Sequence, residues 1–467
     1  MKVQNIGGRF SILALLVCMV FTAQSQQNMN LLGTWSDPTL PGSFQYNNTY
    51  NEVWGIAVND HEYAIIGSTM GTHFIDVTDP TNIFEAFFVP GADQGGVIIH
   101  RDYHDYQGYL YAVADEGEST LQIMDISNLP NEVTVVSDNN DIIEQAHNIF
   151  IDEEVGKLYA LAAKGGDSGY KAMKIYSLED PLDPKKIGQY GVIGGEGFGH
   201  VHDLYAKNDK AFMNCGFDGL FIVDFSGDDP VLLDRYSNAD YPESGYNHSG
   251  WADEDIEYYY FADETHGSAM KTLKINDFSG TEIVGTFDAG NDDPFSIAHN
   301  QIVHDGYLYV SYYYDGVQVY KLDDQEAPCR VASYATSSID NRDNYEGAWG
   351  VYPMLPSGLV LVSDMQEGLF VFEGVDVECS GPVANEEVEL QNTRVFPNPT
   401  TDEVIVELDK TIDDLKLFDL QGTQYSLNWN QVGSQTLISL PESAGMYILQ
   451  ITADGSTISK KVSKLQN

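Results

Sequence analysis

The sequence predicts an all-β fold, a seven-bladed β-propeller followed by a small C-terminal immunoglobulin-like β-sandwich. A strand-and-turn segment recurs seven times, each repeat contains four short strand patterns, and no helical periodicity interrupts them. The clearest copy runs from Gly219 to Pro230, G-L-F-I-V-D-F-S-G-D-D-P, an apolar β-rich run that ends in an acid and a proline turn.

Related segments occupy residues 71–80, 120–130, 172–181, 273–280, 316–323 and 368–374. Equivalent positions are about fifty residues apart, and a unit of that size is too small to bury its own apolar face. Such repeats form propellers or solenoids. In the fourth repeat, strand patterns at 202–206, 210–215, 219–224 and 231–236 favour a four-stranded propeller blade.

The last repeat lacks a fourth strand pattern before the chain becomes acidic and loses its apolar alternation. The missing pattern is found near the N-terminus, where L-L-G-T-W-S-D (Leu31 to Asp37) is similar to the fourth strands of other repeats. We therefore expect this segment to complete the last blade and close the ring, which leaves no inner sheet edge unpaired.

Composition narrows the classes of partner. The chain has 71 acidic and 23 basic residues, a net charge of −48, which disfavours binding to nucleic acid or to an anionic membrane. Cations, neutral ligands and basic proteins remain, and the acidity could also serve solubility alone. Residues 1–25 have the pattern of an export signal peptide, and no later run is long enough for a transmembrane helix.

Three cysteines follow the predicted signal peptide. Cys329 and Cys379 each come just after the third strand of neighbouring repeats, so they should lie on the same rim. We predict a disulfide between them in an oxidising compartment, and we expect Cys215 to be a buried free thiol.

One position at the start of the first strand is occupied by histidine in five repeats. The long links between repeats emerge on the same face, so this position should surround one mouth of the channel. Repeats one and seven have tryptophan there. The residues are Trp54, His100, His147, His202, His248, His299 and Trp349.

Three interpretations of this predicted ring remain open. The histidines could bond to neighbouring blades and hold the ring together. They could instead bind a divalent transition metal, with Asp203 as a further ligand and Asn148 or Asn300 orienting the imidazoles. Finally, an organic ligand could be held by the histidines and Arg101 between Trp54 and Trp349.

Other chemistry is sparse in the sequence. We find no nucleophile elbow and no phosphate-binding loop, so no catalytic residue is assigned and enzymatic activity stays open. Acidic turns such as residues 288–293 could hold Ca²⁺, although no EF-hand pattern is present and solvated turns explain them as well.

The C-terminal part forms a separate domain in this interpretation, with bounds of 26–374 for the propeller, 375–392 for a linker and 393–467 for the sandwich. F-P-N-P (Phe396 to Pro399), D-L-Q-G, A-G-M-Y-I-L-Q-I and a basic last strand resemble the C-terminal sorting domain of type IX secretion substrates in Gram-negative bacteria. The resemblance implies recognition by the type IX secretion machinery, passage across the outer membrane and a secreted or surface-attached product.

The repeats themselves resemble the LVIVD-repeat, choice-of-anchor B group of exported bacterial proteins. F-I-V-D-F-S, F-I-D-V-T-D-P, Q-A-H-N, I-A-H-N and G-A-W-G-V-Y-P carry this resemblance. It implies a propeller at the cell surface and supplies no catalytic residues. We therefore expect a monomeric binding or adhesion module with an extracellular ligand; the alternative is a metal-dependent hydrolase or lyase that uses the histidine ring.

Overall fold

The computed structural model describes residues 28–379 except 279 and 292, and residues 393–465 except 409, 420–423, 426, 428, 442 and 454–455. The predicted signal peptide and residues 380–392 of the predicted linker lie outside the described residues. The chain divides into two compact units, residues 1–379 and 380–467, which we describe separately.

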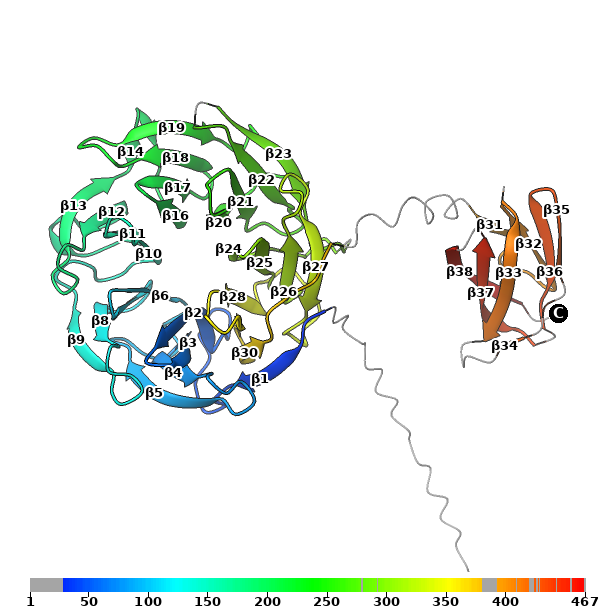
Figure 1. The fold of residues 1–467 in the computed structure, drawn as a ribbon, viewed down its shortest axis with the longest axis horizontal. Coiled ribbons are helices and arrows are strands. Elements are labelled where there is room, and N and C mark those ends of the chain that lie inside the picture. The colour runs from blue at the N-terminus through cyan, green and yellow to red at the C-terminus, as the bar shows by residue number, and fades with distance from the viewer. Residues whose placement is uncertain are drawn as a thin grey trace, which may run out of the picture. The chain divides into compact units, whose positions relative to one another are not determined.

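The first unit contains seven four-stranded antiparallel sheets, which surround a central channel (Figure 1). The first four are β2 (Tyr50–Val58), β3 (His61–Ser68), β4 (Gly71–Asp76), β5 (Phe84–Pro90); β6 (Arg101–Tyr106), β7 (Tyr109–Ala114), β8 (Leu121–Asp125), β9 (Thr134–Asn139); β10 (Asn148–Asp152), β11 (Lys157–Ala163), β12 (Lys171–Ser177), β13 (Lys185–Tyr190); and β16 (Asp203–Lys207), β17 (Lys210–Asn214), β18 (Leu220–Asp224), β19 (Val231–Tyr236).

The remaining three are β20 (Asn247–Ala252), β21 (Tyr258–Asp263), β22 (Met270–Ile275), β23 (Thr281–Phe287); β24 (Gln301–His304), β25 (Tyr307–Ser311), β26 (Val317–Lys321), β27 (Cys329–Tyr334); and β28 (Ala348–Tyr352), β29 (Val360–Asp364), β30 (Gly368–Phe372) with β1 (Leu31–Trp35). A short ribbon of β14 (Val192–Ile193) and β15 (Glu196–Gly197) lies outside these sheets.

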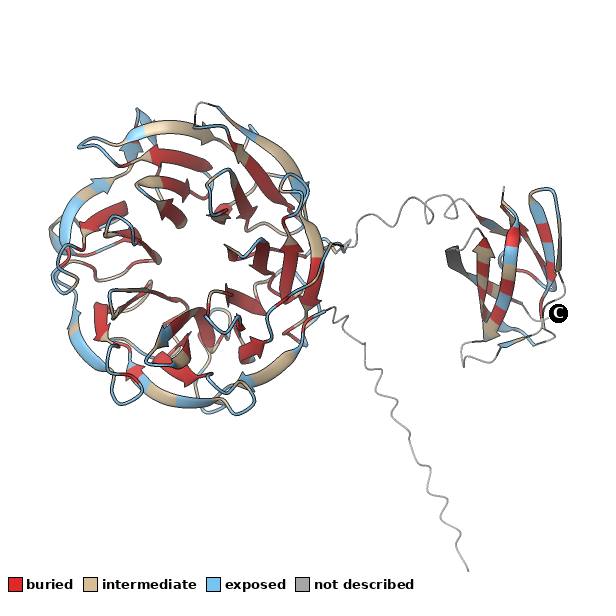
Figure 2. Ribbon diagram, in the orientation of Figure 1, coloured by how far each residue is buried: buried red, intermediate tan, exposed pale blue. Residues whose placement is uncertain are grey.

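Burial falls from the channel to the outer rim of each sheet (Figure 2). All six residues of β4 are buried, whereas five of the six residues of the outermost strand β9 are exposed. Facing sheets pack through large side chains, as where the rings of Phe212 and Tyr259 stack at 4.4 Å between centroids. The apolar core therefore lies between neighbouring sheets, and the prediction of an all-β, propeller-like fold is confirmed.

Helices contribute almost nothing to the described residues, whose single helix is the three-residue 3₁₀ turn η1 (Gly166–Ser168). None of the described residues forms a helix that is long and apolar enough to cross a membrane.

The N-terminal strand completes the last sheet, as the sequence predicts. β1 pairs antiparallel with β30, from Leu31 opposite Phe372 to Trp35 opposite Leu369. The last sheet therefore takes its outer strand from one end of the unit and its three inner strands from the other. This pairing closes the ring.

A disulfide reinforces the closure. Cys329, the first residue of β27, is bonded to Cys379 across a Cα–Cα distance of 6.0 Å. Cys215 is buried and forms no disulfide. Both predictions about the cysteines are confirmed.

The second unit consists of two four-stranded sheets. One contains β31 (Arg394–Phe396), β32 (Glu403–Glu407), β36 (Gln435–Ser439) and β35 (Trp429–Val432); the other contains β34 (Gln424–Tyr425), β33 (Ile412–Asp419), β37 (Gly445–Ala453) and β38 (Ser456–Lys464). Alternating apolar residues such as Val404, Val406, Leu417 and Leu449 form one buried cluster. The unit thus has its own core.

The disulfide should stabilise the first unit mainly by restricting its unfolded state. For a separation of 50 residues, loop-closure entropy corresponds to at most about 4 kcal/mol. We expect Cys329→Ser to lower the free energy of unfolding by up to that amount in urea titrations. Cys215→Ser changes no cross-link and serves as the control. Equal stability of Cys329→Ser and the wild type under oxidising conditions would contradict a stabilising role.

Candidate functional site

Five histidines and one tryptophan form a closed ring of side chains around one mouth of the channel. Each lies within two residues of the first residue of the innermost strand of its sheet. Successive ring centroids are 4.0 to 5.4 Å apart, in the order His100, His147, His202, His248, His299, Trp349 and back to His100. The structure therefore brings the five predicted histidines and Trp349 together.

The ring lines a cavity of about 330 Å³. Glu116 and Glu264 line it too, together with the aromatic side chains of Tyr313 and Tyr345. His200 lies beside the ring, with its centroid 5.6 Å from that of His202. The cavity therefore combines imidazole nitrogens with carboxylate and phenol oxygens.

Hydrogen bonds orient three of the imidazoles in the same way. Nδ1 of His147 lies 2.7 Å from Oδ2 of Asp115, Nδ1 of His248 lies 3.1 Å from the carbonyl of His299, and Nδ1 of His299 lies 2.6 Å from the carbonyl of Trp349. An oxygen acceptor requires Nδ1 to carry the proton, which leaves the Nε2 lone pair available. These bonds also connect neighbouring sheets, so a structural role and a ligand-binding role are compatible.

Most of the ring is neutral at physiological pH. Burial lowers the pKa of His299 to about 3, and burial, together with neighbouring imidazoles, lowers the pKa of His202 and of His248 far below the ordinary value. For His147, burial is the largest single influence and acts to lower the pKa, but the hydrogen bond to Asp115 and the charges of Asp115, Glu116 and Glu264 together outweigh it, and the pKa is raised. Neutral imidazole is the form that binds metal ions.

Two glutamates of the cavity were missed in the sequence. Burial raises the pKa of Glu264 to about 7, and the same cause raises that of Glu116 to about 7. Each ends an A-D-E segment at the end of the second strand of its sheet, Ala114–Glu116 at the end of β7 and Ala262–Glu264 at the end of β21. The repeated A-D-E tripeptide is the sequence signal from which these two glutamates could have been predicted.

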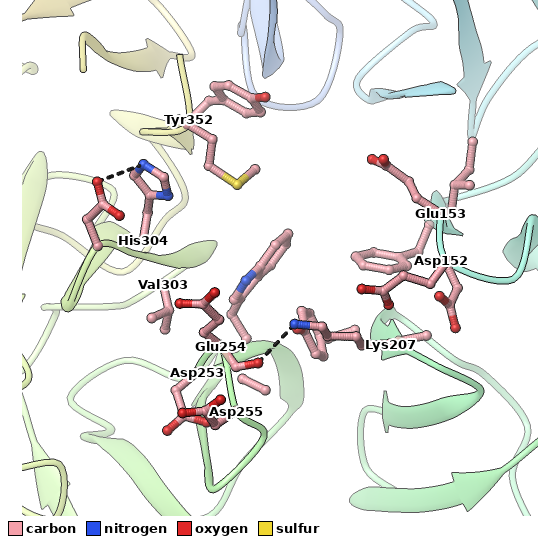
Figure 3. A pocket seen from close by; sticks show the side chains of 18 of the residues that line it. Asp152, Glu153, Lys207, Asp253, Glu254, Asp255, Val303, His304 and Tyr352 are labelled. Carbon is pink, nitrogen blue, oxygen red and sulfur yellow. Dashed lines mark hydrogen bonds and ion pairs between the residues drawn. The ribbon is translucent and has the colours of Figure 1, made fainter. Parts of the chain in front are cut away.

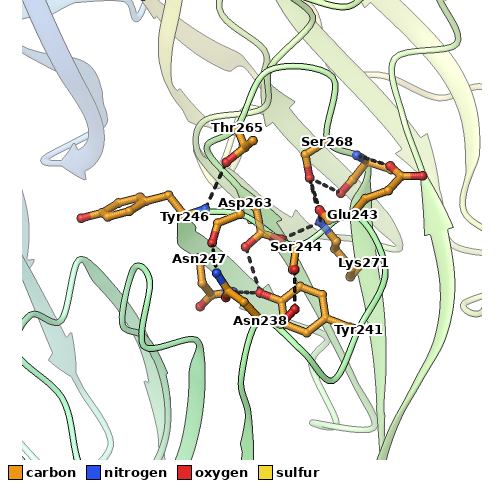
Figure 4. Close-up of polar contacts among 12 residues, drawn as sticks. Asn238, Tyr241, Glu243, Ser244, Tyr246, Asn247, Asp263, Thr265, Ser268 and Lys271 are labelled. Atoms are coloured by element: carbon orange, nitrogen blue, oxygen red, sulfur yellow. Dashed lines mark hydrogen bonds and ion pairs between the residues drawn. The ribbon is translucent and has the colours of Figure 1, made fainter.

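A buried polar network supports the segment that carries His248 and Glu264 (Figure 4). Nζ of Lys271 donates to Oδ2 of Asp263 at 2.5 Å, and both side chains are fully buried. The hydroxyl of Tyr241 donates to Oδ1 of Asp263 at 2.9 Å. Asp263 pairs across the sheet with Asn247, the residue before His248. The network thus holds in place Asp263 and Asn247, the residues that immediately precede Glu264 and His248.

A second polar layer lies deeper in the channel. It contains Asn148, Asp203 and Asn300, all three predicted as ligand residues, and the carboxyl groups of Glu52 and Asp102. Burial raises the pKa of Glu52 to about 8 and that of Asp203 to about 7. The three predicted residues therefore lie near the ring but do not line its cavity as we expected.

Trp54 is the clearest departure from the expected ring. In β2, Asn51 and Glu52 have no partner in the strand register, and in β28 Trp349 and Gly350 have none at the corresponding place. The two pairs of residues are therefore equivalent. Trp54 comes three residues later, about 10 Å further along a strand. The prediction that Trp54 occupies the ring position is therefore wrong, and Asn51 occupies it in this sheet.

Trp54 instead lines a cavity of about 900 Å³ at the opposite mouth. Figure 3 shows this cavity with acids such as Asp152, Glu153 and Asp253 around it. Nε1 of Trp54 donates to Asp105 at 2.8 Å, and its ring contacts those of His104 and Tyr352. Aromatic side chains and many acids line this mouth, including Asp152, Glu153, Asp253, Glu254, Asp255 and Asp305.

One further predicted ligand residue, Arg101, and the acidic turn proposed to hold Ca²⁺ both have local partners. The guanidinium of Arg101 donates to the main-chain oxygens of Ser68 and Asp93, at 2.8 and 2.7 Å, so it ties the first two sheets together. In the acidic turn at 288–293, the Asp288 carboxylate accepts the main-chain N–H of Gly290 and the Asp293 carboxylate that of Phe295. These bonds shape the turn, as in ordinary Asx turns.

The described residues contain two groups of side chains whose donor atoms could share one metal ion. In the first, His202, His248 and Glu264, the atoms lie within 4.8 Å of one another; in the second, Glu52, His100 and Asp102, they do so as well. The first group faces the cavity of the ring, and the second connects the ring to the deeper layer.

Comparison with known proteins identifies the second unit. Residues 394–464 match the secretion system C-terminal sorting domain. The protein is secreted. Such a domain directs export by the type IX system, so the protein acts outside the cell or attached to the outer cell surface, as the sequence predicts. No curated protein sequence matches the chain.

Two solved structures show similarity to the fold. The structure of U3-55K has a TM-score of 0.51 at 6% sequence identity and covers 75% of this chain and 100% of its own. The β-propeller domain of Myceliophteria thermophila Cps50 (Swd1) has a TM-score of 0.44 at 9% identity and covers 67% of this chain and 94% of its own. At these identities the likeness concerns the fold alone.

Loss of Lys271 should destabilise the sheet that carries His248 and Glu264. Lys271→Met leaves the buried Asp263 carboxylate without its cation, a change that typically costs about 3–5 kcal/mol. We expect a loss of this size in urea unfolding. Lys274→Met removes an exposed pair with Glu326 and should change stability little. Similar losses in the two variants would argue against a special role of the buried pair.

The raised pKa of Glu52, about 8, should make the stability of the metal-free protein depend on pH. A raised carboxyl pKa stabilises the folded state below the ordinary value near 4.5, and this contribution is lost as pH rises to about 8. In EDTA, the melting temperature of Glu52→Gln should therefore increase relative to wild type between pH 5 and pH 8. A difference that is constant over this range would contradict the raised pKa.

Proposed function

We propose that the protein is an extracellular binding propeller whose ligand site is the histidine-ring cavity, and that this cavity holds a divalent transition-metal ion. The observation that carries the proposal is the group of His202, His248 and Glu264, whose donor atoms lie within 4.8 Å of one another. Two imidazoles and a carboxylate are common ligands of such ions.

The surroundings of the three groups support metal binding. His248 is oriented by the carbonyl of His299, which leaves its Nε2 facing Glu264 at 3.8 Å. The Tyr313 hydroxyl donates to the other oxygen of Glu264. Outer contacts of this kind orient the ligands of metal sites and raise their affinity.

A second candidate function is metal-dependent hydrolysis or elimination. Three protein ligands would leave coordination positions open toward a cavity of about 330 Å³, the arrangement in which a metal activates water. Glu116, with a pKa of about 7, lies in the same cavity and could exchange a proton with a bound substrate. Turnover would distinguish this candidate from binding alone.

The finer architecture belongs to the same proposal. The seven sheets support a seven-bladed propeller over residues 26–374 of the LVIVD-repeat, choice-of-anchor B type, and the two C-terminal sheets support an immunoglobulin-like sandwich over residues 393–467. We also propose that residues 1–25 are a cleaved signal peptide, that residues 375–392 link the two domains and that the protein is a monomer.

Elemental analysis tests the proposal. We expect the secreted chain, purified without a polyhistidine tag, to contain near-stoichiometric Zn, Cu, Mn or Fe by ICP-MS. His248→Phe keeps an aromatic ring in place but removes both nitrogens, and together with Glu264→Gln it should remove about one ion per chain.

His304→Ala is the matched control, because His304 lies at the opposite mouth and should not alter metal content. Circular dichroism establishes that each variant is folded. Unchanged metal content in the folded His248→Phe/Glu264→Gln variant would overturn the proposal and assign the ring a purely structural role.

A further inference from the structure

Glu52, His100 and Asp102 bring one imidazole and two carboxyl groups together inside the channel. Their donor atoms lie within 4.8 Å of one another. The exposed fractions of the three residues are 7%, 4% and 5%. Glu52 comes from β2, and His100 and Asp102 come from the start of β6, so the cluster spans the first two sheets.

His100 differs from His147, His248 and His299, whose imidazoles each have a hydrogen-bond partner. Neither Nδ1 nor Nε2 of His100 has a hydrogen-bond partner, and both atoms are buried. A neutral imidazole has one N–H to donate and one lone pair to accept a hydrogen bond. Burying these groups without partners is costly. A ligand that accepts the lone pair of one nitrogen would remove part of this cost.

The two carboxyl groups are held in place by donors that leave other lone pairs available. Nδ2 of Asn300 donates to Oε2 of Glu52 at 2.7 Å, and the main-chain N–H of Val53 donates to Oε1 at 3.0 Å. The main-chain N–H of Ile149 donates to Oδ2 of Asp102 at 2.7 Å. Each oxygen can accept more than one bond, so both groups are oriented and still able to bind a cation.

Space for Glu52 depends on a glycine of the last sheet. A Cβ atom at Gly350 would lie 2.0 Å from Oε1 of Glu52, so any side chain there would displace the carboxyl group. The glycine therefore allows the last sheet to approach Glu52, which lines the same narrow cavity as Asp102 and Asn300.

We propose that Glu52, His100 and Asp102 form a second divalent-cation site, one layer below the histidine-ring cavity and separate from His202, His248 and Glu264. One nitrogen and two carboxylate oxygens suit first-row ions such as Zn²⁺, Mn²⁺ or Fe²⁺ better than Mg²⁺ or Ca²⁺, which prefer oxygen ligands alone.

The site has a route of entry and a chemical reason to bind. His100 also lines the ring cavity, so an ion could pass from that cavity to the two carboxyl groups. Two carboxyl groups buried this close together cannot both carry a charge at low cost without a cation, and a divalent ion would compensate both charges. The site does not require an ion in the upper group, because the two groups share no residue.

Zinc titration of the full secreted chain, stripped with EDTA and free of a polyhistidine tag, tests this site. We expect isothermal titration calorimetry and ICP-MS to give two zinc ions per wild-type chain. Glu52→Gln/Asp102→Asn should retain one, His248→Phe/Glu264→Gln should retain the other, and the combined variant should retain none.

Asp203→Asn is the matched control, since Asp203 is a partly buried acid of the same layer that belongs to neither group. It should still bind two ions. If Glu52→Gln/Asp102→Asn does not fold, His100→Phe keeps the ring packing and removes the only nitrogen ligand, and it should bind one ion.

The outcomes separate the two proposals. Full zinc binding by both folded lower-site variants would overturn the second site and leave the upper one standing. A chain that loses its only ion with Glu52→Gln/Asp102→Asn, and not with His248→Phe/Glu264→Gln, would support the second site and overturn the upper one.

Discussion

Closure of the ring by the pairing of β1 with β30 is the constraint on which the rest of the first unit depends. Each sheet is covered by its two neighbours, so an open ring would expose the apolar faces of the first and last sheets to water. Closure also places seven innermost strands around one axis. Residues at one repeat position then lie at one height in the channel, which is how histidines about fifty residues apart become neighbours at 4.0 to 4.6 Å between ring centroids.

The same closure buries the side chains within the channel and sets their charge states. Imidazoles are kept neutral there, as the low pKa of His299 illustrates, while carboxyl groups such as Glu52 are driven toward the protonated form. Both shifts come from the cost of burying a charge. A cation in the channel would offset that cost for the carboxylates and use the lone pairs that the neutral imidazoles offer. The buried imidazoles and carboxyl groups of the channel are therefore also the groups that a bound cation would stabilise most.

The sequence predicted what depends on repetition, and it did not predict what depends on geometry across sheets. The strand pattern, the closing strand and the Cys329–Cys379 disulfide follow from the repeats. Trp54 was misplaced because V-W-G in β2 resembles A-W-G in β28, whereas the strand pairing makes Asn51 the residue equivalent to Trp349. Glu264 was overlooked because it follows a second strand and reaches His248 only in the folded sheet. A contact between side chains on two neighbouring strands depends on the strand register, which a single sequence does not specify directly.

Net charge connects the channel with the extracellular location. A chain of −48 charges attracts cations from solution and raises their concentration near its surface. The acids that line the opposite mouth add to this attraction, although salt screens it beyond about 10 Å. The imidazoles and carboxyl groups of the channel thus lie where the field of the whole protein would bring a divalent ion, and long-range attraction and local coordination act in the same direction.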